Sequence, residues 1–138
     1  MRIYVMLMLS VIVGLCSIWA GGAVNAQPVQ AAPGVPFALE VGQTAELGDG
    51  LMVTFDKLLA DSRCPATAEC ITAGSVRVQV SVGGQAYTLT LGDMAAGDTA
   101  SAQLANGITL ELLDVTPYPA SQQDTPDAVT AVQLVVVD

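Results

Sequence analysis

Two cysteines separated by five residues lie in the stretch Asp61 to Cys70, which reads DSRCPATAEC. Cysteines in this arrangement could bind a soft metal ion, act as a redox pair or form a disulfide. A redox pair favours Cys-x-x-Cys at a helix N-terminus, and a zinc site lacks ligands here, because the chain has no histidine and only one further cysteine, Cys16. The pattern therefore predicts a disulfide between Cys64 and Cys70, and copper held by this pair with Met94 is the weaker interpretation.

The charged residues beside the cysteines have a structural and a functional interpretation. Arg63 could pair with Asp61, Glu69 or Asp56 across the loop, and we favour this structural role. The alternative is that Asp61, Arg63, Pro65 and Glu69 form a loop displayed to a partner, for example a protease. A loop held by a disulfide loses little conformational entropy when it binds, which makes such a display effective.

The same residues carry a resemblance to a known group of proteins. The run Asp61-Ser62-Arg63-Cys64-Pro65, followed by Cys70 and Ala73-Gly74, resembles a segment shared by small bacterial exported proteins and lipoproteins. A later Pro-Tyr-Pro motif of that group is matched at 117–119. Many members have tryptophan where this chain has Thr72. The resemblance spans the predicted domain and implies export, a disulfide and a β fold, but it implies no reaction.

The rest of the chain offers little for catalysis. It has no histidine, no Gly-x-Ser-x-Gly elbow and no phosphate-binding loop. Asp93 with Asp98, and Asp124 with Asp127, could supply oxygen ligands to calcium, but the pattern of a dedicated calcium loop is missing. We therefore expect these acids to be solvated turn residues. The sequence predicts no catalytic residue, no bound metal and no cofactor.

The N-terminal segment has the pattern of a secretory signal peptide. Arg2 precedes an uncharged apolar run over residues 3–20, and small residues at 24 and 26 form a cleavage site after Ala26. An uncleaved membrane anchor is the alternative, because the run approaches the length of a membrane span. Leu15 before Cys16 argues against lipidation of that cysteine. We expect a secreted, periplasmic or cell-surface protein.

Cleavage after Ala26 would leave 112 of the 138 residues, the size of one domain. It would also remove Arg2 and lower the formal net charge from −9 to −10. Such a surface repels nucleic-acid phosphates and anionic membranes, so we expect neither as a partner. A disulfide is stable in the oxidising compartments outside the cytosol, which agrees with export.

Residues 37–138 show the alternation of apolar and polar residues that is typical of half-buried strands. The clearest runs are 37–41, 76–82, 87–91 and 128–137, with glycine-containing hairpin turns at 48–50, 83–84 and 106–107. The last run is apolar and should lie centrally in a sheet. Residues 27–36 contain three prolines and predict a flexible arm. The prediction is an all-β domain of about seven to eight strands, either a β-sandwich or a partly closed barrel.

The predicted domain also contains two similar halves. Residues 37–43 resemble 87–93, and 44–55 resemble 101–112 with the turn glycine in register. The valine-rich runs 76–82 and 131–137 then end the two halves. Any two hairpins with a glycine turn look somewhat alike, so an internal duplication is one of two interpretations.

These observations favour a non-catalytic, extracytoplasmic β-sandwich that binds another protein or an envelope component, or has a structural role. A protease-inhibitor-like protein using the loop from Arg63 to Cys70 is a second hypothesis. A calcium-dependent binder or hydrolase using the late acidic residues is a third.

Overall fold

The protein is all-β in the residues that its computed structural model describes, 27–120 and 131–138. The strands are β1 (Val29–Gln30), β2 (Phe37–Glu40), β3 (Thr44–Glu46), β4 (Met52–Asp61), β5 (Ser75–Val82), β6 (Gln85–Gly92), β7 (Ser101–Gln103), β8 (Thr109–Thr116) and β9 (Ala131–Val137). The predicted signal segment, residues 128–130 of the predicted last strand, and Asp124 and Asp127 lie outside the described residues. None of the described segments is a helix that could cross a membrane.

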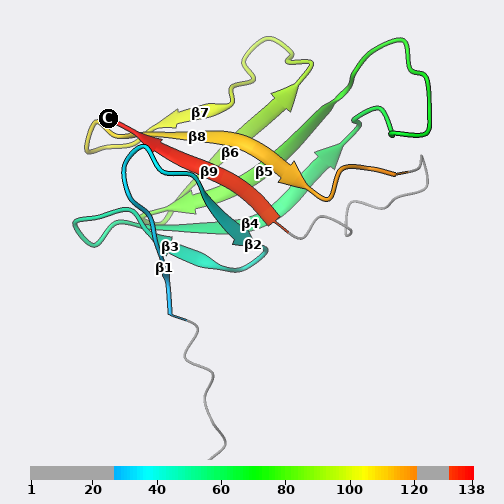
Figure 1. The fold of residues 1–138 in the computed structure, drawn as a ribbon. Coiled ribbons are helices and arrows are strands. Elements are labelled where there is room, and N and C mark those ends of the chain that lie inside the picture. Colours follow the sequence, from blue (N-terminus) through cyan, green and yellow to red (C-terminus); the bar gives the residue numbers. More distant parts are fainter. Residues whose placement is uncertain (1–26, 121–130) are drawn as a thin grey trace, which may run out of the picture.

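The strands form two packed sheets, as a β-sandwich requires (Figure 1). The first sheet has the order β1-β3-β4-β5-β6, and the second has the order β2-β9-β8-β7. Neighbouring strands are antiparallel except for β1 and β3, which are parallel. The sheets do not close into a barrel, so the sandwich prediction is confirmed and the barrel alternative is wrong.

The core lies between the sheets and follows the predicted alternation. Every second residue of β5 is buried: Val76, Val78, Val80 and Val82. The strand β9 lies between β2 and β8, so the apolar run at the end of the domain is an inner strand, as predicted. Burying such a run between two neighbours hides its backbone groups from other chains.

The two halves of the chain repeat the same topology and exchange one strand. In the first half, β3, β4 and β5 form consecutive neighbours, and in the second half β7, β8 and β9 do the same. The first strand of the first half, β2, pairs with β9 of the second half. The first strand of the second half, β6, pairs with β5 of the first half. Neither half can therefore complete its sheet without a strand of the other half.

Hydrogen bonds and irregularities repeat as well. Phe55 donates its backbone N–H to Gln43, and Leu112 donates to Ala100 at the corresponding positions. Both β4 and β8 have a register shift directly after these residues, which marks a β-bulge. The structure also corrects the sequence match by one residue in the last strands. Phe55 pairs with Val80 and Leu112 pairs with Leu134, so Val80 corresponds to Leu134 rather than to Val135.

Part of the predicted flexible arm is paired with the domain. The strand β1 lies beside β3, and Ala31 donates its backbone N–H to Glu46 at 2.9 Å. Further along, Gly34 donates to Val136 of the second sheet at 2.8 Å. These bonds hold residues 29–31 beside the strand β3 of the first sheet and Gly34 beside the strand β9 of the second.

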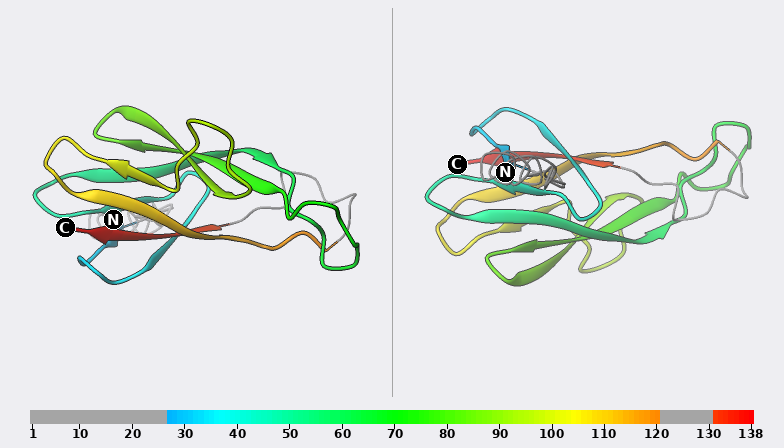
Figure 2. Two further views of the ribbon diagram at one scale, coloured as in Figure 1. Left: turned by 90° about the horizontal axis from the view of Figure 1, so that it is seen from above. Right: turned by 90° about the horizontal axis from the view of Figure 1, so that it is seen from below.

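The connections gather at opposite ends of the sandwich. The three hairpin turns β3–β4, β5–β6 and β7–β8 lie at one end, together with the C-terminus (Figure 1). The long crossover between β4 and β5 projects from the other end (Figure 2). The predicted cysteine loop is this crossover, so it lies apart from the hairpin turns.

Neighbouring leucines in β8 test the assignment of the core. Leu112 is 1% exposed and Leu113 is 40% exposed. Leu112→Ala should lower the free energy of unfolding by about 2–5 kcal/mol, because it leaves a cavity between the sheets. Leu113→Ala should change it by no more than about 0.5 kcal/mol. Urea denaturation measures both values, and equal losses would contradict the packing described here.

Candidate functional site

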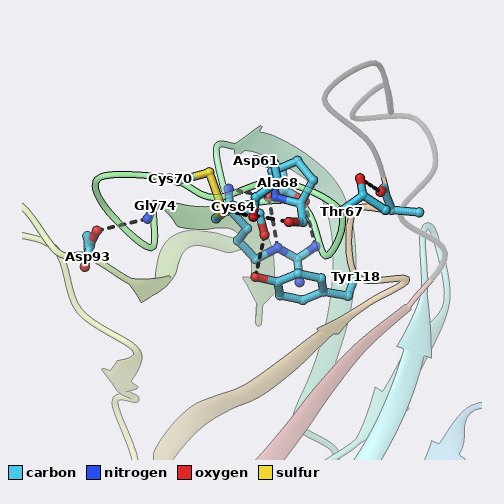
Figure 3. The surroundings of a disulfide bond; sticks show 11 residues. Asp61, Cys64, Thr67, Ala68, Cys70, Gly74, Asp93 and Tyr118 are labelled. Carbon is cyan, nitrogen blue, oxygen red and sulfur yellow. Dashed lines mark hydrogen bonds and ion pairs between the residues drawn. A yellow bond between two sulfur atoms is a disulfide. The ribbon is translucent and has the colours of Figure 1, made fainter.

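The disulfide between Cys64 and Cys70 closes the crossover loop, as predicted (Figure 3). The two Cα atoms are 5.8 Å apart, and the loop leaves the first sheet after β4 and returns to it at β5. A disulfide forms in an oxidising environment such as the extracytoplasmic space. Because both thiols are used in this bond, neither is free to bind copper with Met94, which is an exposed residue elsewhere.

Arg63 forms a two-pronged ion pair with Asp61. Its Nε donates to Asp61 Oδ1 at 2.9 Å, and its Nη2 donates to Oδ2 at 2.6 Å. The two side chains are only 8% and 9% exposed. Of the three acids considered from the sequence, Asp61 is therefore the partner; Glu69 is exposed, and Asp56 accepts hydrogen bonds from Gln79 and Ser81.

The same guanidinium reaches the second sheet. Its Nη1 donates to the carbonyl of Val115 in β8 at 2.7 Å, and its Nη2 donates to the carbonyl of Pro117 at 3.1 Å. A guanidinium has five N–H groups. The two bonds to these carbonyls and the two bonds to Asp61 use four of them. Arg63 thus joins the crossover of the first sheet to the end of a strand in the second.

Tyr118 covers this ion pair and is itself bonded to the loop (Figure 3). Its ring centroid is 4.8 Å from the guanidinium carbon of Arg63, within the range of a cation–π contact. Its hydroxyl donates to the carbonyl of Cys64 at 2.8 Å. The Pro-Tyr-Pro motif therefore contacts the cysteine loop, although more than fifty residues separate them in the sequence.

Backbone bonds extend this contact toward the tip. Ala66 donates its N–H to the carbonyl of Pro119 at 3.1 Å, and the Thr67 hydroxyl donates to the carbonyl of Ala120 at 2.7 Å. One side of the cysteine loop is thereby paired with the chain that follows β8. The loop is fixed on this side by hydrogen bonds and across its width by the disulfide.

The base of the loop is closed by a glycine. Gly74 has a φ of +73°, and a Cβ built there would lie 1.9 Å from the carbonyl oxygen of Ser62. No side chain fits at that position. The Gly74 N–H donates to Asp93 at 2.9 Å, and Ser62 and Ser75 bond to each other across the base. The two ends of the crossover can approach closely only because residue 74 is a glycine.

The four residues predicted as a partner-binding loop have unequal positions. Asp61 and Arg63 are held in the ion pair, and Pro65 is buried, whereas Glu69 is exposed. The loop is exposed over residues 69–73, and the tip is taken as Glu69, Cys70 and Ile71, which include its large apolar side chain. Ile71 was not identified from the sequence, yet its side chain is fully exposed. The only sequence feature that could have indicated it is a large aliphatic residue in an otherwise polar and small-residue loop.

The acids considered as calcium ligands have structural partners where the structure describes them. Asp93 accepts the Gly74 N–H, and Asp98 binds Arg77 at 3.0 Å and the Ala95 N–H at 2.9 Å. In the ranges 27–120 and 131–138, no three potential metal-ligating side chains come together. The calcium hypothesis gains no support from these residues.

Comparison with protein-family models, with curated proteins and with solved structures found no match to this chain. The function must therefore be argued from the residues themselves. Two features distinguish the crossover loop: a buried cation with four hydrogen bonds at its base and an exposed apolar side chain at its tip.

Removing the guanidinium should destabilise the domain strongly. Arg63→Ala leaves the carboxylate of Asp61 buried without its cation, which typically costs about 3–5 kcal/mol. The matched control is Arg77→Ala, because the Arg77 side chain is 40% exposed and pairs with Asp98 nearer the surface. We expect the free energy of unfolding of that variant to fall by no more than about 1 kcal/mol. Urea denaturation compares the two, and an equal, small loss in both would contradict the structural role of Arg63.

The disulfide should contribute less than the ion pair. On the chain-entropy estimate, a closed loop of this length stabilises the protein by roughly 2–2.5 kcal/mol. The free energy of unfolding of the double variant Cys64→Ser/Cys70→Ser should fall by that amount. The variant should still fold, because the hydrogen bonds from Ala66 and Thr67 remain. Mass spectrometry without reductant checks the bond itself. Two free thiols in protein recovered from an oxidising compartment would contradict it.

Proposed function

We propose that the protein is a non-catalytic, exported module that binds an extracytoplasmic protein or envelope component through the tip of its cysteine loop. The tip is defined as Glu69, Cys70 and Ile71. The full exposure of Ile71 at the end of a loop held by a disulfide is the observation that carries this proposal. Export is supported by the disulfide, by the signal-peptide pattern of residues 1–26 and by the resemblance to exported proteins.

A rigid apolar tip suits binding for two reasons. Burying a large aliphatic side chain at an interface contributes roughly 1.5–3 kcal/mol to the free energy of binding. Ile71 can contribute in this way because its side chain is fully exposed to solvent in the free protein. Ordering a flexible loop would offset part of that gain, but this loop is already fixed by the disulfide and by bonds to residues 119 and 120. Glu69 beside the tip supplies one negative charge for orientation.

The inhibitor hypothesis is less well supported by the geometry. A protease of trypsin-like specificity would need the Arg63 side chain inside its pocket, yet that side chain is 8% exposed and donates four hydrogen bonds within the domain. Its release would leave Asp61 without a partner. The tip at residues 69–71 is therefore the better candidate for contact with another molecule.

Affinity capture with matched baits tests the proposed binding surface. The exported protein is immobilised and exposed to solubilised envelope and culture medium of the producing organism. We expect at least one component to be retained by the wild type and lost with Ile71→Asp, because a charge at the tip would be buried without a partner.

The control bait is Met94→Asp, which adds the same charge at an exposed apolar residue away from the tip. It should retain what the wild type retains. If all three baits retain the same components, or if none retains any, the tip is not a binding surface and the proposal is wrong.

A further inference from the structure

A cavity is lined by residues of the three hairpins β3–β4, β5–β6 and β7–β8. The turns of these hairpins lie at the end of the sandwich away from the cysteine loop (Figure 1). The volume of the cavity is about 320 Å³, which is within the range of sites that bind small molecules. Asp49 and Leu51 line it from the β3–β4 turn, Gln85 and Tyr87 from β6, and Leu104 and Asn106 from the β7–β8 turn. No residue of the cavity takes part in the proposed binding surface at the loop tip.

The inner part of the cavity is apolar. Leu104 is buried in the core, and Leu51 and Tyr87 are half-buried and pack against it. Tyr87 therefore adds an aromatic side chain to the wall of the cavity. A ligand in this cavity would place an apolar face on these three side chains.

The rim of the cavity carries polar groups without protein partners. Among the described residues, the Asp49 carboxylate, the Gln85 amide and the Tyr87 hydroxyl form no hydrogen bond within the protein. Asn106 uses its side-chain oxygen to accept the Ile108 N–H at 3.3 Å, which leaves its amide donors available. The rim thus presents both donors and acceptors, supplied by all three hairpins.

This combination narrows the ligand class. An anion would meet Asp49 and the negative net charge of the chain, and a cation would find only this one carboxylate among the lining residues. A purely apolar ligand would use the inner surface but none of the polar groups. A sugar ring matches both parts, because it has an apolar C–H face and hydroxyls that donate and accept hydrogen bonds around its edge.

We propose that this cavity binds a neutral saccharide, with the apolar face of one pyranose ring against Tyr87 and the sugar hydroxyls bonded to Gln85, Asn106, Asp49 and the Tyr87 hydroxyl. The pseudo-symmetry of the fold supports a single composite site. Asp49 and Asn106 occupy corresponding turns of the two halves and both line the same cavity. The β5–β6 hairpin adds Gln85 and Tyr87 from β6.

Backbone NMR of the full chain, expressed with its own N-terminal segment and purified as exported, tests the site. The probes are methyl glucoside, methyl galactoside and N-acetylglucosamine. At least one should shift signals confined to residues 48–51, 83–87 and 104–107. Tyr87→Phe and Gln85→Ala should each weaken binding by about 2- to 12-fold, the effect of one hydrogen bond. Thr88→Ala is the control, since Thr88 is exposed and does not line the cavity.

Three results would overturn the proposal. The first is that none of the three saccharides shifts signals at the turns. The second is that binding is unchanged in both Tyr87→Phe and Gln85→Ala. The third is that cyclohexanol binds as tightly as the best saccharide, which would make the cavity an apolar site. Far-ultraviolet circular dichroism and a melting curve for each variant confirm that a loss of binding is not a loss of folding.

Discussion

A single buried guanidinium determines how the loop end of this sandwich is built. Arg63 is taken almost wholly out of water, and a charge in that position is tolerated only when it is paired and hydrogen-bonded. Asp61 supplies the counter-charge and accepts two of the N–H groups, and the carbonyls of Val115 and Pro117 accept two more. Because these acceptors belong to both sheets, the requirement to satisfy one side chain fixes the crossover loop relative to the second sheet. The exposed tip at Ile71 is the outcome of that fixed position.

The contact also explains where the two similar halves differ. The residues that follow β8, 117–120, lie at the same end of the sandwich as the residues that follow β4, and the two segments are in contact. Tyr118 from the later segment stacks on Arg63 and bonds to Cys64 from the earlier one. The first half contributes the disulfide and the buried cation Arg63, and the second half contributes Tyr118 and the carbonyl acceptors of Arg63. The sheets keep the pseudo-symmetry, whereas the loops have become different surfaces.

The fold could be predicted from the sequence because the alternation of residues such as Val76, Val78 and Val80 reflects burial on one face of a strand. The disulfide followed from the cysteine count and the expected compartment. The carbonyl acceptors of Arg63 at Val115 and Pro117 could not be predicted, because every residue type has a backbone carbonyl and the sequence does not show which ones accept a hydrogen bond. The cavity was missed for a related reason: Asp49, Gln85 and Asn106 look like ordinary turn residues until the topology brings three turns together.

The central claim is that the Arg63 guanidinium is held by both sheets in the native protein. Nitrogen-15 NMR of the arginine side chains observes this directly. The account predicts separate, slowly exchanging signals for the two Nη groups of Arg63, with nuclear Overhauser contacts to the Tyr118 ring, because rotation about Cζ–Nη would break bonds to Asp61 and Val115. A single averaged signal that exchanges with water as rapidly as that of free arginine would contradict it.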